Sequence, residues 1–335
     1  MRVLVTGGGG FLGRAIALRL LARGDEVVTL GRTDQPALRA AGVEVFRGDI
    51  GDHAVAHAAV VGSQAVVHTA AKVASWGRAA DFHRTNVVGT QNLIAACRAH
   101  KIARLVYTSS SSVAYNGTGD VEGIDESHPY AARFDAHYPR TKALAEQMVL
   151  TANAPPLATV ALRPHLVWGP GDTQLLPRAI AAARAGRLRL PAGPPKLVDC
   201  TYIDNAVDAH VLALDRLAPD AACAGKAYFI SQGAPLPMAE LIARVLAAAG
   251  APAVDKTISP GTLYLAGCLA EAAYAALRIR DREPPITRFV ARQMTTAHWF
   301  DIGAARRDLG YQPRVSIEEG LRRLTASRSS LGPAT

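Results

Sequence analysis

The stretch Thr6-Gly7-Gly8-Gly9-Gly10-Phe11-Leu12-Gly13 decides the fold of this chain. It follows a strand-like apolar run at 3–5 and opens a helix-like stretch at 11–23. Glycines let such a turn approach a pyrophosphate closely, and the helix N-terminus offers free N–H groups and a favourable dipole to the phosphates. The alternative is a βα turn that is only tight. The context favours a dinucleotide site, and we predict cofactor contacts from Gly7, Gly10, Phe11, Leu12 and Gly13.

The first half of the chain alternates strand-like and helix-like segments, a rhythm that indicates βαβ units and a parallel sheet. The expected strands are 3–5, 26–30, 43–47, 65–69, 104–108 and 158–162, and the expected helices are 11–23, 86–100 and 138–152.

After Pro164 this rhythm loosens, and helix-like stretches at 205–216, 238–250 and 263–277 have no matching number of strands. We predict an α/β fold, a Rossmann-type doubly wound parallel sheet with a smaller, mostly helical C-terminal substrate lobe. The expected boundaries are a dinucleotide-binding domain at 1–165, to which some later segments return, a substrate lobe at 166–326, and a tail at 327–335.

Composition narrows the partners of this 335-residue chain, which is 49% hydrophobic and 19% charged. The formal net charge of +9 is compatible with nucleic acid or anionic lipid. Arginines such as Arg178, Arg184, Arg187 and Arg189 are spaced along the chain rather than clustered, which favours a solvated surface. We expect no nucleic-acid partner, and we expect a homo-oligomer.

The spacing of the four cysteines indicates free thiols rather than a metal site. They have no CxxC spacing and no neighbouring histidine at ligand spacing, so we expect no metal. The start of the chain lacks a signal-peptide pattern, and we expect a cytoplasmic protein. The four residues are Cys97, Cys200, Cys223 and Cys268.

The segment 263–277 is almost entirely apolar or small, with Glu271 as its charged residue and Arg278, Arg280 and Arg282 just after it. It is shorter than the roughly 20 residues that a membrane span needs. One interpretation is a buried or amphipathic helix. The other is a surface that docks to a membrane or to a partner enzyme.

The end of the second strand bears on which dinucleotide binds. NAD-preferring sites carry an acidic residue there, whereas this strand ends in Gly31-Arg32. Arg32 can pair with a 2′-phosphate, so we predict NADP(H) over NAD(H). An ordinary surface arginine is the alternative.

Two further strand ends complete the predicted cofactor site. Asp49 and Ile50 end the third strand, where an adenine ring would lie. Ala70, Ala71 and Lys72 end the fourth, beside the expected nicotinamide ribose, although small alanines also suit plain packing.

Tyr138 and Lys142 lie four residues apart at the start of a predicted helix, so they share one face. A phenol with a pKa near 10 is a poor acid–base group at neutral pH, and a nearby ammonium lowers that pKa. The pair predicts proton exchange with a substrate oxygen while a nicotinamide exchanges a hydride with its carbon. One hydroxyl of the run 107–112 is expected to polarise the substrate carbonyl, and local capping is the alternative for each.

Together these motifs resemble the extended short-chain dehydrogenase/reductase superfamily, in the family's order and over most of the chain. The resemblance implies that Tyr138 is the catalytic acid/base, Lys142 its partner and Ser110 the catalytic hydroxyl. It also implies that Asn86 holds the active-site architecture. The matching segments are 6–13, 70–71, 86–90, 107–113, Tyr138 with Lys142, and 163–172, of which Pro164 and His165 would lie near the nicotinamide.

The C-terminal half resembles the 3β-hydroxysteroid dehydrogenase-like branch in segments 199–205, 226–230, 284–289, 298–301 and 305–311. Within it, segments 95–100 and 236–238 resemble the bacterial reductases of head-to-head olefin biosynthesis. That resemblance implies NADPH reduction of the 3-keto group of a lipid-like 2-alkyl-3-oxoalkanoic acid to a hydroxy acid, which a β-lactone-forming enzyme then consumes. Ser110 departs from the threonine expected in that group, but both supply a hydroxyl.

Three alternatives stay open. A 3β-hydroxysteroid or sterol dehydrogenase would use the same pair in the oxidative direction. A nucleotide-sugar epimerase fits the C-terminal motifs less well, and a non-catalytic NADP sensor would not need the pair. An Ala- and Leu-rich lobe suits alkyl chains, and Arg163 or His165 would hold a carboxylate unless their roles are structural.

Overall fold

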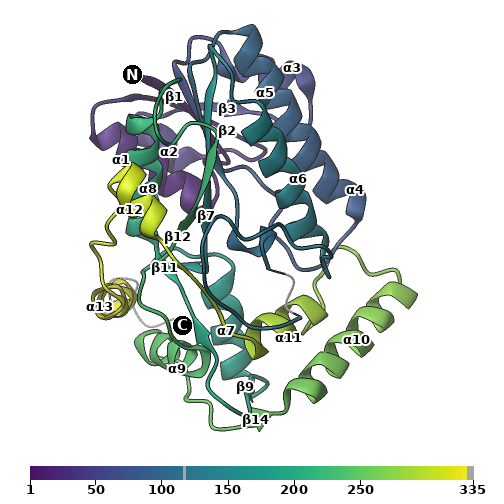
Figure 1. Cartoon of the computed structure of the whole chain (residues 1–335). Coiled ribbons are helices and arrows are strands. Elements are labelled where there is room, and N and C mark those ends of the chain that lie inside the picture. The colour runs from purple at the N-terminus through teal and green to yellow at the C-terminus, as the bar shows by residue number, and fades with distance from the viewer. Residues whose placement is uncertain (116–117, 330–335) are drawn as a thin grey trace.

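The computed structural model describes residues 1–115 and 118–329 and centres on a seven-stranded parallel sheet (Figure 1). The strand order is β3-β2-β1-β4-β5-β7-β12, so the direction of winding reverses between β1 and β4. In such sheets a ligand binds beyond the carboxyl ends of the strands at this reversal. The strands are β1 (Arg2–Thr6), β2 (Glu26–Gly31), β3 (Glu44–Arg47), β4 (Ala65–His68), β5 (Arg104–Thr108), β7 (Ala158–Pro164) and β12 (Lys226–Ile230).

Helices cover both faces of this sheet, as the prediction of a doubly wound fold requires. One face carries α1 (Phe11–Ala22), α8 (Ile203–Arg216) and α12 (Gly303–Leu309). The other carries α3 (His53–Val60), α5 (Gly89–Ala99) and α6 (His137–Thr151). The sheet strands are apolar on both sides because both sides are buried.

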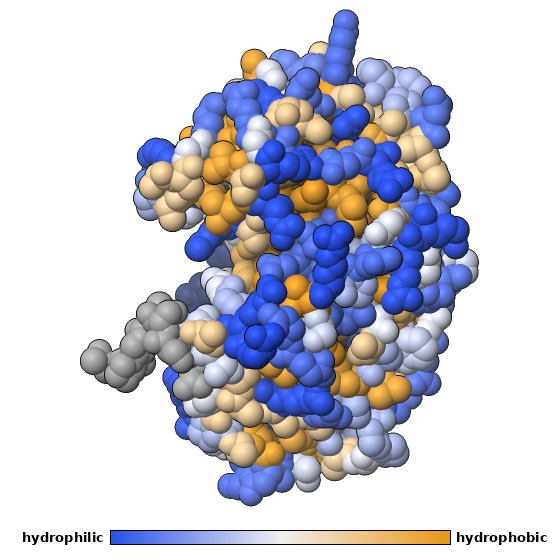
Figure 2. Space-filling model, turned by 90° about the vertical axis from the view of Figure 1, so that its left-hand side faces the viewer, coloured by the Kyte–Doolittle hydropathy of each residue, from blue (hydrophilic) through white to orange (hydrophobic). Residues whose placement is uncertain are grey.

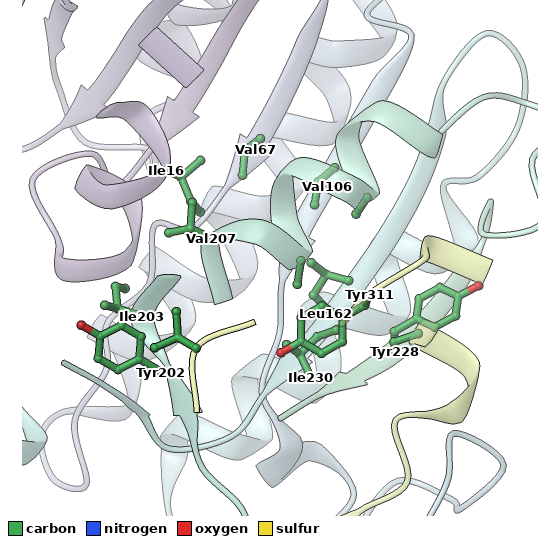
Figure 3. Close-up of a cluster of buried hydrophobic side chains, with 14 of the residues drawn as sticks. Ile16, Val67, Val106, Leu162, Tyr202, Ile203, Val207, Tyr228, Ile230 and Tyr311 are labelled. Carbon is green, nitrogen blue, oxygen red and sulfur yellow. The ribbon is translucent and has the colours of Figure 1, made fainter. Parts of the chain in front are cut away.

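The larger apolar core joins the two halves of the sequence. Figure 3 shows Val207 of α8 beside Ile16 of α1, in the same cluster as strand residues such as Val106 and Leu162. Each of these side chains is at most 2% exposed. β12 and α8 come from the second half of the chain but complete the first-half sheet, so the core does not separate at residue 165.

The remaining C-terminal segments form the smaller portion below the sheet in Figure 1. It is built mainly from helices, as predicted, but it also contains short strands that the sequence did not reveal. Its longer helices are α7 (Leu175–Arg184), α9 (Met238–Ala248), α10 (Pro260–Ala276) and α11 (Arg288–Thr295). Its strands include β9 (Leu190–Pro191), β10 (Leu197–Val198), β14 (Thr257–Ile258) and β15 (His298–Phe300).

One predicted helix starts differently, and the predicted cofactor residues after two strands lie in loops. The expected helix 86–100 begins as a π-helical segment, His83–Val88, which places Asn86 on a local irregularity of the kind often found at functional sites. The third and fourth strands end at Arg47 and His68, so the predicted cofactor residues of both lie in the loops beyond. Helix α13 (Ile317–Ser329) extends into the predicted tail, the rest of which lies outside the described residues.

The surface is mainly hydrophilic on the side of α1 and α13, with hydrophobic residues scattered among charged ones (Figure 2). None of the helices within 1–115 and 118–329 combines the length and apolar character needed to cross a bilayer. The four cysteines are free thiols.

Candidate active site

The glycine loop has a geometry that only glycine fits. Gly7 has a φ of +76°, and a Cβ there would lie 2.8 Å from the backbone N of Ala70. A Cβ on Gly13 would overlap the carbonyl oxygen of Gly7. Helix α1 starts after Gly10 without a side-chain cap, so its first N–H groups suit a phosphate, and the loop fits the pyrophosphate of a dinucleotide.

A buried histidine fixes the strand ends around this loop. His68 accepts from the Thr6 hydroxyl at Nδ1, 2.7 Å away, and donates from Nε2 to Thr90 Oγ1 at 2.9 Å. This direction follows because Thr90 uses its own proton on the Asn86 carbonyl. Burial, with the Lys142 charge nearby, lowers the pKa of His68 to about 3, so it stays neutral. No pattern in the sequence predicted this link.

The far end of the loop brings together more groups than the sequence indicated. Arg32 directly follows β2, and Nε of Arg47 donates to the carbonyl oxygen of Arg32 at 3.2 Å. Gln35 is 6% exposed, and neither atom of its amide has a hydrogen-bond partner among the described residues. A Cβ on Gly8 would lie 2.8 Å from Gln35 Oε1, so this amide borders the glycine loop. Gln35 and Arg47 were not predicted as site residues.

The other predicted cofactor residues are tied into the loops that follow β3 and β4. Asp49 accepts from the N–H of Gly51 at 2.8 Å and pairs with Arg84 at 3.4 Å, while Ile50 is buried. Ala70 donates its N–H to Thr6 Oγ1 at 3.2 Å, and Ala71 follows it, partly buried.

Asn86 connects the β4 loop to helix α6. Its Oδ1 accepts from the N–H of Lys72 at 2.7 Å, and its Nδ2 donates to Thr141 Oγ1 at 2.9 Å. Thr141 precedes Lys142, so the amide fixes the helix that carries Tyr138 and Lys142. The role that the family resemblance implies for Asn86 matches this geometry.

Tyr138, Ser110 and Lys142 meet at the carboxyl edge of the sheet. Tyr138 lies in the first turn of α6 and is partly buried, and it is near enough to Ser110 for the serine to lower the pKa of the phenol. Lys142 is 2% exposed, donates to the Thr108 carbonyl and lies 4.2 Å from the centre of the Tyr107 ring.

The lowering of the Tyr138 pKa by Lys142 stays a prediction. Burial raises the pKa of Tyr138, and the Ser110 side chain lowers it. Burial also lowers the pKa of Lys142 to about 7. The Lys142 ammonium donates to the Thr108 carbonyl. Burial disfavours the charged forms of both Lys142 and Tyr138.

The tertiary structure separates hydroxyls that the sequence left equivalent. Thr108 donates to His210 Nε2 at 2.8 Å, and Ser111 contacts His165 Nδ1 at 2.6 Å. The Ser109 hydroxyl is buried without a partner among the described residues. Ser110 is partly exposed and contacts Tyr138, so it is the hydroxyl of this run that is placed for a substrate oxygen.

Arg163 and His165 do not hold a carboxylate from outside the protein. Arg163 is buried and donates to both oxygens of Glu146, at 2.6–3.1 Å. His165 Nε2 lies 2.8 Å from His298 Nδ1, and burial lowers the pKa of His165 well below its usual value. Both candidates therefore have structural partners, because burial demands them. His165 lies just beyond Pro164, the last residue of β7.

Helix α10 exposes most of its apolar surface. Leu265 is 57% exposed and Leu269 is 63% exposed, and Leu277 just after the helix is 69% exposed. Glu271, the charged residue of this helix, is buried and bound to Arg288 at 2.7 Å. The helix is therefore not buried on all sides; it has one buried and one exposed face, and its docking to a membrane or a partner stays a prediction.

Comparisons with known proteins show the family and the fold of the chain. A model of the 3-beta hydroxysteroid dehydrogenase/isomerase family matches residues 4–259. A 2-alkyl-3-oxoalkanoate reductase of Stenotrophomonas maltophilia is 56% identical over 98% of this chain and all of its own length. One of Shewanella oneidensis is 46% identical over 96% of this chain and 85% of its own length. The UDP-glucose 4-epimerase of Thermus thermophilus, solved with NAD, has a TM-score of 0.75 at 25% identity, with both chains fully covered.

Proposed function

The chain belongs to the 3-beta hydroxysteroid dehydrogenase/isomerase family, and we propose that it reduces the 3-keto group of long-chain 2-alkyl-3-oxoalkanoic acids with NADPH. It is an oxidoreductase with a Rossmann-type fold. The observation that carries the substrate proposal is 56% identity, along the whole chain, to a reductase named for this substrate. The hydroxy acid product is then a substrate for olefin biosynthesis.

The residues of the site suit this reduction. The Ser110 hydroxyl donates a hydrogen bond to the keto oxygen and polarises the carbonyl. Tyr138 donates its proton to the same oxygen as negative charge develops there. The hydride for the carbonyl carbon would come from a nicotinamide cofactor held by the glycine loop. The product therefore gains one hydride at carbon and one proton at oxygen, and the tyrosinate that remains takes its proton back from water.

Arg32 and Arg47 support the choice of NADPH. The Arg47 side chain donates to the Arg32 carbonyl at the β2–β3 edge, where Gly31 pairs with Arg47 in parallel register. Two guanidinium groups at this edge suit a 2′-phosphate better than a ribose hydroxyl. The end of β2 lacks the carboxylate that is typical of NAD sites.

We also propose that α10 lies on an anionic lipid surface. Its exposed leucines form a face without charged side chains, and Arg278, Arg280 and Arg282 follow directly. This combination suits an interfacial helix beside acidic headgroups. A substrate with two long alkyl arms partitions into the same surface.

The reverse reaction tests the substrate, because 3-keto acids lose carbon dioxide readily. Purified protein receives NADP and synthetic 2-alkyl-3-hydroxyalkanoic acids of increasing length, and NADPH is followed by absorbance. Each buried methylene contributes about 0.8 kcal/mol, so kcat/KM is expected to rise with chain length until the pocket is full.

The family match favours one second candidate, a 3β-hydroxysteroid dehydrogenase. Efficient oxidation of a 3β-hydroxysteroid, with no activity on the long-chain hydroxy acids, would establish that alternative. A sensor without catalysis would bind the cofactor and turn over neither compound.

A further inference from the structure

We propose that the pocket around Arg280 binds the carboxylate of the acid substrate, an inference that rests on the proposed function. A 2-alkyl-3-oxo acid carries its carboxylate one carbon from the reacting carbonyl, so a cation must lie near the active site. Arg163 and His165 do not fill this role. Arg163 is bound to Glu146, and His165 is bound to His298.

A pocket of about 540 Å³ supplies the cations instead. Its lining has five cationic and three anionic side chains, a difference of two positive charges. Glu283 is already bonded to Ser75 and Arg178, which leaves the pocket more positive still. The charged lining residues are Lys72, Arg78, Arg278, Arg280, Arg282, Asp81, Asp281 and Glu283.

Arg280 is the cation held ready for a ligand. Its guanidinium lies 5.0 Å from the centre of the Trp76 ring, and the indole N–H is fixed by the Ile279 carbonyl at 2.9 Å. No carboxylate pairs with Arg280 within the described residues. A stacked guanidinium keeps its N–H edges free for the two oxygens of a carboxylate. Lys72, by contrast, already has Asp81 at 3.3 Å.

The pocket is connected to the catalytic helix through Lys72. Lys72 lines it, and Asn86 joins the Lys72 backbone to Thr141 on α6, one turn after Tyr138. The charge of Arg280 also reaches His137, the neighbour of Tyr138: burial lowers the pKa of His137 first, and Arg140 and Arg280 lower it further.

The walls suit an amphiphilic acid rather than a free inorganic anion. The Trp76 ring lies beside the Arg280 guanidinium. The Tyr274 ring of α10 contacts the Trp76 ring edge-on, with 6.4 Å between ring centres. From there the apolar face of α10 leads away from the pocket. An alkyl arm can follow these rings while its carboxylate meets Arg280.

Turnover of matched acids and esters tests this site. In Arg280→Met, KM for a 2-alkyl-3-hydroxyalkanoic acid should rise roughly tenfold to a hundredfold, the range typical of a lost charge-assisted hydrogen bond. The methyl ester of the same compound should show no change. Arg280→Lys should recover part of the loss. Arg184→Met, outside the pocket on α7, is the control and should behave as the unaltered protein.

Calorimetric binding of decanoate and of decan-1-ol, without vesicles, separates this inference from the proposed function. Decanoate should bind the unaltered protein and Arg184→Met but bind Arg280→Met at least tenfold more weakly, and decanol should not distinguish them. If decanoate binds through Arg280 but no hydroxy acid is oxidised, the proposed function is wrong and the site stands. An Arg280→Met protein that folds normally, and handles acid and ester as the unaltered protein does, would overturn the site.

Discussion

Ser111 donates a hydrogen bond to His165, with 2.6 Å between the serine Oγ and the imidazole Nδ1. The direction of this hydrogen bond follows from the contact between His298 and Gln293. His298 Nε2 lies 2.8 Å from the Gln293 carbonyl, which can only accept, so His298 Nδ1 accepts from His165 Nε2. His165 Nδ1 must then accept from Ser111. The loop that carries Ser110 is thus anchored to β15 through two neutral histidines.

Ser111→Ala should therefore lower stability more than it lowers catalysis. The change leaves a buried imidazole nitrogen without a donor, which costs about 1–3 kcal/mol. Urea unfolding at pH 7.5 measures the loss. Ser109→Ala is the matched control, because its buried hydroxyl has no partner among the described residues and should cost little. Equal losses in the two variants would contradict the anchor.

Tyr138→Phe removes the proton donor and keeps the ring. Turnover should fall by about 10²–10⁴-fold, the usual contribution of general acid–base catalysis, while the fold and cofactor affinity survive. Steady-state kinetics and a cofactor titration measure the two effects. Ser110→Ala should cost less than the tyrosine change. A loss below tenfold in Tyr138→Phe would show that another group moves the proton.

Lys142 should titrate far below an ordinary lysine in the cofactor-free protein. Burial lowers its pKa to about 7, so the side chain is charged at pH 6 and neutral at pH 9. NMR of protein with ¹³C-labelled lysine follows this directly, and Lys142→Arg identifies the resonance by its absence. If every lysine resonance titrated above pH 9, the buried environment of Lys142 would be wrong.

Arg32→Ala and Arg47→Ala should each raise KM for NADPH about tenfold and change KM for NADH little, because only NADPH has the 2′-phosphate. Gln35→Leu should weaken both cofactors, since its unpartnered amide borders the shared glycine loop. Arg187→Ala, distant in sequence and exposed, serves as control. Equal effects of the arginine variants on both cofactors would remove their role in NADPH preference.

The double change Leu265→Ser and Leu269→Ser should release the protein from anionic vesicles. Burying a leucine contributes about 1.5–3 kcal/mol, so binding to phosphatidylglycerol vesicles should fall at least tenfold. Co-sedimentation measures it. Val61→Ser, 56% exposed in the loop after α3, is the control. Unchanged sedimentation of the double variant would exclude α10 as the lipid contact.

The sequence by itself determined the features that are local in the chain. The glycine loop, the alternating strands and the spacing of Tyr138 and Lys142 each depend on residues within one turn or one helix. Such patterns carry their own geometry, so the sheet and the glycine turn could be predicted before any contact was known. The short strands of the smaller portion could not, because two-residue strands have no periodicity to detect.

The tertiary structure alone decided which side chains are free to act. Arg163 and Glu146 are 17 residues apart, and His165 and His298 are 133 apart, so their pairing could not be inferred from spacing. Burial forces each of these groups to find a partner, which removes both from substrate binding. The parallel register of β2 and β3 sets Arg47 beside Arg32, and Arg280 packs on Trp76 with no carboxylate partner in the described part of the chain. A charged side chain is free to bind a ligand only where the fold leaves it without a partner, and its position in the sequence does not show where that happens.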